Sequence, residues 1–67
     1  MTVDDALTLC AAAKLVVLSA ALEGEFVRVT VAPLKVVPAT AIKHLYDAGA
    51  RFVLYSWEHG GEGFLLK

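Results

Sequence analysis

The sequence of 67 residues contains only one cysteine and nearly balanced charges, and each of these features excludes a class of protein. One cysteine cannot form an internal disulfide, so the chain is not a disulfide-stapled secreted miniprotein, and a reducing cytoplasm is the expected location. Six basic residues against seven acidic ones leave a net charge of −1, without the positive excess typical of nucleic-acid-binding domains. Hydrophobic residues make up 58% of the chain, which excludes disorder.

The length excludes a separate cofactor domain and a large active-site cavity. A chain of 67 residues is expected to form one small domain, residues 1–67, whose core is too small to be hollow and still stable. The chain begins with Met1 and shows no linker, which predicts a complete small protein.

The most hydrophobic stretch, residues 6–22, does not predict a membrane helix. It has 17 residues with Lys14 near its middle, whereas a membrane span needs about 20 apolar residues without a central charge. Asp4 and Asp5 precede it, where a signal peptide would carry basic residues. We therefore expect a buried helix that leads into a buried strand, and no contact with a membrane.

Helical spacing of apolar residues predicts two helices, over residues 3–13 and 38–48. Thr2 is placed to cap the first helix, and two aspartates lie in its first turn, where the helix dipole favours negative charge. Pro38 suits the first turn of the second helix, and Gly49 is a natural stop at its end.

Each predicted helix is followed by two predicted strands. Residues 15–22, a turn at Glu23-Gly24 and the alternating residues 25–32 predict the first hairpin. Residues 51–58, a turn at Gly60-Gly61 and residues 62–66 predict the second. Pro33 ends the first hairpin, because proline has no amide proton to donate to a strand partner.

The two halves resemble each other at an offset of 37 residues. Six pairs at this offset are identical: Ala11/Ala48, Ala13/Ala50, Val16/Val53, Ser19/Ser56, Gly24/Gly61 and Glu25/Glu62. We therefore predict an α+β fold of two pseudo-repeated α-β-β units, residues 2–32 and 38–67, with a four-stranded antiparallel sheet and both helices on one face. The helices match poorly at this offset, so a one-residue slip or coincidence is the alternative.

No group of residues assembles a catalytic or metal site. The sequence His59-Gly60-Gly61 is similar to an oxyanion-hole motif of lipases, but the nucleophile elbow which that motif serves is absent, and a hairpin turn explains the glycines. Glu58, His59 and Glu62 supply at most two ligands to one side of the hairpin, fewer than the four of a structural zinc site. We expect no metal, no cofactor and no enzymatic activity.

Cys10 is expected to be a small core residue. It lies among alanines and leucines without a neighbouring base, so its thiol should have a raised pKa and low reactivity. Asp4 and Asp5 diverge around the helix and do not form a paired-carboxylate site.

If both turns are two-residue loops, strand pairing assigns each strand residue to one of two faces. The first hairpin then pairs Leu22 with Glu25, and the second pairs His59 with Glu62. One face is uniformly apolar and is predicted to be the core under the helices, with Trp57 as its anchor. This predicted core face contains Val16, Leu18, Ala20, Val27, Val29, Val31, Val53, Tyr55, Trp57, Phe64 and Leu66.

The opposite face of the sheet is predicted to be the interaction surface. Two helices cover only one face of four strands, and exposed apolar patches beyond a few hundred Å² are uncommon on monomers. We expect a protein partner or a second copy of the chain to cover this face. The residues expected in the contact are Leu15, Val17, Phe26, Arg28, Phe52, Leu54, Glu58 and Leu65.

These observations favour a small, non-enzymatic protein-binding module. A small protein without catalytic residues is typical of phage- or plasmid-type inhibitors that block a larger complex through protein–protein contact, such as an anti-CRISPR protein. One alternative is a nucleic-acid-binding regulator or antitoxin, which the scattered basic residues do not favour. Another is a subunit that oligomerises into an assembly.

Overall fold

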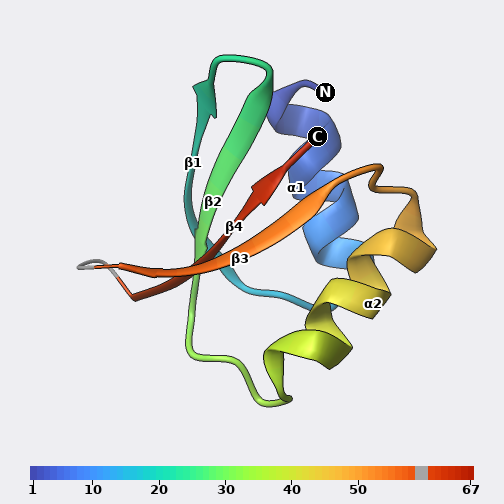
Figure 1. Ribbon diagram of the computed structural model, residues 1–67, viewed down its shortest axis with the longest axis vertical. Helices are drawn as coiled ribbons and strands as arrows, with labels where there is room; N and C mark the ends of the chain where they lie inside the picture. The colour runs from blue at the N-terminus through green and yellow to red at the C-terminus, as the bar shows by residue number, and fades with distance from the viewer. Residues whose placement is uncertain (59–60) are drawn as a thin grey trace.

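The structure, a computed structural model, describes residues 1–58 and 61–67, with only the backbone of Glu58. Its elements follow the order α-β-β-α-β-β, as Figure 1 shows. They are α1 (Val3–Ala12), β1 (Val17–Glu23), β2 (Phe26–Val31), α2 (Pro38–Ala48), β3 (Val53–Glu58) and β4 (Gly61–Leu66). Neither helix of the described residues is long and apolar enough to cross a membrane.

The four strands form one antiparallel sheet in the order β1-β2-β4-β3. Both helices pack on the same face of this sheet (Figure 1), and they share one hydrophobic core with it. The predicted α+β class is therefore confirmed. The buried core residues are Ala6, Cys10, Ala13, Val27, Val29, Val31, Ala41, Leu45, Ala50, Val53, Phe64 and Leu66.

Local signals start both helices where the sequence predicts. The Thr2 hydroxyl accepts the backbone N–H of Asp5 at 3.1 Å, and the Asp5 carboxylate accepts the N–H of Thr2 at 3.3 Å, which forms a capping box. The second helix begins at Pro38 and stops at Gly49, whose φ of 121° is accessible without strain only to glycine. The first helix ends one residue earlier than predicted and is followed by Lys14 in a left-handed conformation, with φ 60°.

The first hairpin pairs two positions away from the predicted register. Glu23 pairs with Phe26, so the two-residue turn consists of Gly24 and Glu25, and Leu22 pairs two residues beyond its predicted partner. Both candidate turns contain Gly24, whose φ is 63°, so glycine alone did not decide between them.

The second hairpin is also shifted by two positions, in the opposite direction. Trp57 pairs with Glu62, and the backbone of Glu58 pairs with Gly61. The predicted turn at Gly60-Gly61 and the predicted pair of His59 with Glu62 involve residues 59–60, which lie outside the described residues. Because side chains alternate with a period of two, a shift of two residues leaves β2, β3 and β4 with their predicted faces.

The faces predicted for the start of β1 are wrong, because the register shifts between Val17 and Ser19. This irregularity turns Leu15 and Val17 toward the core, against which both pack partly buried. Val16 and Leu18, which were expected in the core, are 65% and 63% exposed.

Trp57 is not a core anchor, and this prediction is also wrong. Its position in β3 alternates onto the helix side, but the β3–β4 hairpin projects beyond the helices (Figure 1), and the indole is 70% exposed. Phe64 is the large buried aromatic residue instead, with Tyr55 packed edge-on at 5.6 Å between ring centroids.

The pairing of β2 with β4 is symmetric about one cross-strand pair, Arg28 and Leu65. These two residues are 37 positions apart, which is the offset of the predicted repeat. The buried residues of the helices correspond at a different offset, since Ala6 and Ala41 are 35 positions apart, as are Cys10 and Leu45. The internal sequence repeat therefore stays a prediction.

Candidate functional site: the open sheet face

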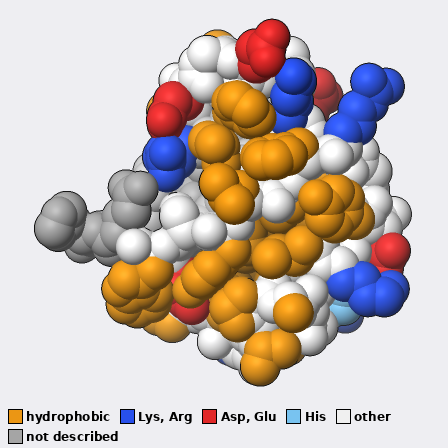
Figure 2. All heavy atoms as spheres, in the orientation of Figure 1, with side chains coloured by type: hydrophobic (Ala, Val, Ile, Leu, Met, Phe, Trp, Pro, Cys, Tyr) orange, Lys and Arg blue, Asp and Glu red, His pale blue; other side chains and the backbone are white. Residues whose placement is uncertain are grey.

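One face of the sheet carries no helix, and we call it the open sheet face. Strand pairing aligns its side chains in rows that run across all four strands. The middle row is Ala21, Arg28, Leu65 and Leu54, and a neighbouring row is Ser19, Thr30, Gly63 and Ser56. Beyond the other side of the middle row lie Glu23 and its cross-strand partner Phe26, together with Phe52 and Lys67, which both contact the Phe26 ring. Figure 2 shows hydrophobic side chains gathered across the side of the molecule turned to the viewer, with charged side chains at its upper rim.

An aromatic pair occupies the end of the open sheet face near the β1–β2 turn. The rings of Phe26 and Phe52 lie 5.4 Å apart between centroids with a tilt of 56°. The Nζ atom of Lys67 lies 5.6 Å from the centroid of Phe26 and 2.9 Å from a carboxylate oxygen of Glu25. Phe52 is still 38% exposed, so the pair forms a surface rather than a second core.

Leucines continue this apolar area into the middle row. Leu54 and Leu65 are cross-strand partners, and Leu54 is 52% exposed. The aromatic pair and the two leucines therefore give neighbouring strands a contiguous apolar area that is open to contact.

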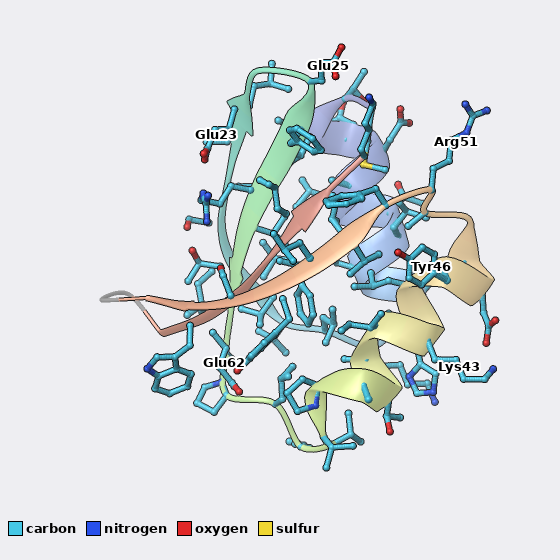
Figure 3. All side chains as sticks on the ribbon, in the orientation of Figure 1. Glu23, Glu25, Lys43, Tyr46, Arg51 and Glu62 are labelled. Carbon is cyan, nitrogen blue, oxygen red and sulfur yellow. The ribbon has the colours of Figure 1, made fainter. Side chains whose placement is uncertain are left out.

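Ion pairs border this area on the side of β1 and the first turn. The Arg28 guanidinium donates to both carboxylate oxygens of Glu23, from Nη2 at 3.1 Å and from Nε. The hydrogen bond from Arg28 holds the pKa of Glu23 below its ordinary value, and that from Lys67 does the same for the pKa of Glu25. Figure 3 shows Glu23 and Glu25 at the same end of the molecule. The charges at this end are therefore held in pairs.

The opposite end of the open sheet face is lined by small polar residues. Gly63 lies in this row, where a Cβ atom would come within 2.4 Å of the carbonyl oxygen of Val29. A side chain at Gly63 would therefore collide with the backbone of the neighbouring strand. The small residues of this row rise less far above the sheet than the aromatic side chains at the other end.

Five of the eight residues predicted for the contact lie together on the open sheet face: Phe26, Arg28, Phe52, Leu54 and Leu65. Leu15 and Val17 do not lie there, because the irregularity in β1 turns both toward the core. The side chain of Glu58 lies outside the described residues.

Sequence reasoning missed the exposed edge of β1. Val16, Leu18 and Leu22 are each between 63% and 65% exposed, although all three are apolar. Residues 15–22 contain no charge, a pattern that is typical of a buried strand and gives no local signal of exposure.

The other candidates for chemistry have structural roles. Cys10 is fully buried, and burial raises the pKa of its thiol to about 11, as expected. Glu62 accepts the backbone N–H of Leu34 at 2.7 Å and the hydroxyl of Tyr55 at 2.9 Å. Figure 3 shows Glu62 pointing toward the segment between β2 and α2, which it ties down. Within the described residues, no group of three or more His, Cys, Asp or Glu side chains is placed to hold a metal ion.

Comparisons of the chain with models of protein families, with curated proteins and with solved structures find no match.

Proposed function

We propose that this protein is a non-enzymatic protein-binding module whose contact surface is the open sheet face. The observation that carries the proposal is the contiguous apolar area of Phe26, Phe52, Leu54 and Leu65, bordered by paired charges. Aromatic and leucine side chains supply the apolar contact, while charged groups at a rim set orientation more than affinity.

No described segment of the chain covers this area. The segment between β2 and α2 does not cover it, because Leu34 packs against the core and its backbone N–H donates to the carboxylate of Glu62. The C-terminal strand is β4, a central strand of the sheet itself. The described residues therefore leave this area open to contact, which supports a binding role.

The narrower role in the proposal is that of a phage- or plasmid-type inhibitor, such as an anti-CRISPR protein, that occupies a surface of a larger complex. Its support is the small size of the chain, together with a sequence that assembles no catalytic group. Such an inhibitor needs only a rigid surface of suitable shape, and a sheet backed by two helices provides one.

The test is capture of a partner from a host lysate by the wild-type protein and by Leu54→Glu. Leu54 is 52% exposed, so a charge there should leave the fold intact, which circular dichroism checks. Val37→Glu is the matched control, because Val37 is 65% exposed and lies in the segment before α2. We expect a partner that wild type and control retain, and that Leu54→Glu binds at least about tenfold more weakly.

Equal binding of the same partner by folded Leu54→Glu would remove the open sheet face as the contact. Binding to duplex DNA, with an affinity that falls steeply as salt rises, would favour the nucleic-acid alternative instead.

A further inference from the structure

A groove of about 330 Å³ lies where three segments of the chain meet: the turn between α1 and β1, the segment between β2 and α2, and α2 itself. Figure 1 shows these segments away from the β1–β2 turn, toward the other end of the molecule. The more buried part of the lining is apolar and comes from Leu15, Ala32 and Leu34. No residue of the open sheet face is among the described residues that line the groove, so it is a separate surface.

Three basic side chains line the same groove, and we call it the basic groove. Lys14 comes from the turn after α1, Lys35 from the segment between β2 and α2, and His44 from α2. All three residues are exposed, and none of the described residues that line the groove is acidic. The groove therefore combines an apolar interior with positive charge contributed by separate segments.

The positive charge of the basic groove is not neutralised within the described part of the chain, where neither of its lysines forms an ion pair. Asp47 is the acidic residue beside it, since Asp47 lines a neighbouring hollow together with Lys14 and His44. Its carboxylate, however, accepts from the Nζ atom of Lys43 at 2.8 Å. The lysines of the groove are therefore available to an anion from outside the chain.

The backbone of Lys14 is a second sign of a binding role. Its φ of 60° is a left-handed conformation that costs lysine more than glycine. The backbone N–H donates to the carbonyl oxygen of Ala11 at 3.0 Å, which any residue at this turn could do. Strain of this kind is concentrated at functional positions, and a lysine side chain here serves the groove better than it serves the turn.

We infer that the basic groove binds a small organic carboxylate with an aliphatic body. The carboxylate accepts charge-assisted hydrogen bonds from the ammonium groups of Lys14 and Lys35, while the aliphatic body covers the apolar lining at Leu15 and Leu34. The volume of the groove is at the lower end of the range for small-molecule sites, which suits a short chain.

The combined lining selects this class of ligand over two simpler ones. A compact anion such as phosphate would leave the apolar lining in contact with water. A neutral aliphatic molecule would cover that lining but leave the lysines without a partner. Only a molecule that carries both parts uses both features of the groove.

Titration of the isotope-labelled full chain with octanoate, followed by NMR, tests the inference. We expect saturable shifts of the backbone signals of Lys14, Lys35 and His44, with a dissociation constant of about 1 mM or below. Octanamide, which has the same body without the charge, and acetate, which has the charge without the body, should each bind at least about fivefold more weakly.

Variants with matched controls test each half of the groove. The double variant Lys14→Gln/Lys35→Gln should bind octanoate at least about fivefold more weakly, because both charges are lost. Arg51→Gln is the charge control and should bind as the wild type does, since Arg51 does not line the groove and Figure 3 shows it beyond the far end of α2.

Val36 and Val37 provide the apolar pair of variants, because they are neighbours that are 45% and 65% exposed and only Val36 lines the groove. Val36→Ser should weaken octanoate binding about threefold, and Val37→Ser should leave it unchanged. Both side chains are exposed, so the fold should stay intact, which the dispersion of the NMR signals checks.

Four outcomes would overturn the inference: no saturable shift up to about 20 mM octanoate, equal binding of octanamide, equal binding of inorganic phosphate, or unchanged binding by the double lysine variant. The result is separable from the proposed role of the open sheet face. Leu54→Glu should bind octanoate as the wild type does, and octanoate should not displace a protein partner held by that face. Shifts centred on Phe26 and Leu54 would instead place the ligand on the open sheet face and contradict a separate site.

Discussion

The two α-β-β halves follow one plan but contribute unequally to the interior. The buried residues of α1 and of the turn after it are small, namely Ala6, Cys10 and Ala13, and β2 adds three valines. The second half adds the larger side chains, with Leu45 from α2 and Phe64 and Leu66 from β4. Small residues in one layer make room for large ones in the other, as close packing of a small core requires.

The glutamate that occurs at matching positions in the two halves, Glu25 and Glu62, has a different structural role in each. Glu25 is exposed and forms an ion pair with Lys67 at the rim of the open sheet face. Glu62, which stands 37 positions later, is partly buried and ties the segment between β2 and α2 to the sheet through Leu34 and Tyr55. A matching sequence position therefore does not imply a matching energetic role, because burial differs.

The largest expected effect comes from the unequal core. Phe64→Ala should lower the free energy of unfolding by about 3–5 kcal/mol, because a fully buried ring leaves a cavity. Val27→Ala, the corresponding position in the first half, should lower it by about 2 kcal/mol, since fewer buried carbons are removed. Trp57→Ala should change it by less than about 1 kcal/mol. Chemical denaturation measures all three. If Trp57→Ala lowered the free energy of unfolding as much as Phe64→Ala, the indole would have to be buried in the core.

The two glutamates give the next comparison. Glu62→Ala should lower the free energy of unfolding by about 1–3 kcal/mol, because the Leu34 amide and the Tyr55 hydroxyl lose their acceptor. Glu25→Ala should show no measurable loss, because its ion pair is solvated. Tyr55→Phe, which removes only one of the two bonds, should fall between them. Equal losses for both glutamates would contradict the difference in role.

The smallest effects concern the two helix ends. Lys14→Gly should raise the free energy of unfolding by about 0.5–1 kcal/mol, because glycine adopts a φ of 60° without the strain of a side chain. Gly49→Ala should lower it by about 1 kcal/mol or more; the new methyl would meet only Leu9 at an ordinary 3.8 Å, so the loss comes from the φ of 121°. Thermal and chemical denaturation should agree on these opposite signs, and a destabilised Lys14→Gly would mean that the lysine side chain itself holds this turn.

Prediction from sequence succeeded where a local signal acts alone. Residues 38–48 were predicted as a helix, and α2 spans Pro38–Ala48, because proline fixes the first turn and Gly49 permits the stop. The capping box at Thr2 likewise needs only residues three positions apart. The open sheet face was predicted for β2, β3 and β4 because an error of two residues in register does not change the side to which a side chain points.

Prediction failed where one residue more or less in a strand decides the outcome. The irregularity between Val17 and Ser19 exchanged the predicted sides of Leu15 and Val17 with those of Val16 and Leu18. No local sequence pattern marks this irregularity. The residues around it are apolar at odd and even positions alike, so either set could face the core. The exposure of Val16 and Leu18 follows from that single shift.

The sequence by itself determined the order of elements, the two helix starts and the apolar character of both sheet faces, because these follow from capping, turn residues and periodicity within a few positions. Only the tertiary structure decided that Phe64 is buried while Trp57 is exposed, that Glu62 holds Leu34, and that the strands order as β1-β2-β4-β3. The physical reason is that burial depends on which surface the helices reach, and their reach is set by packing between residues far apart in the chain.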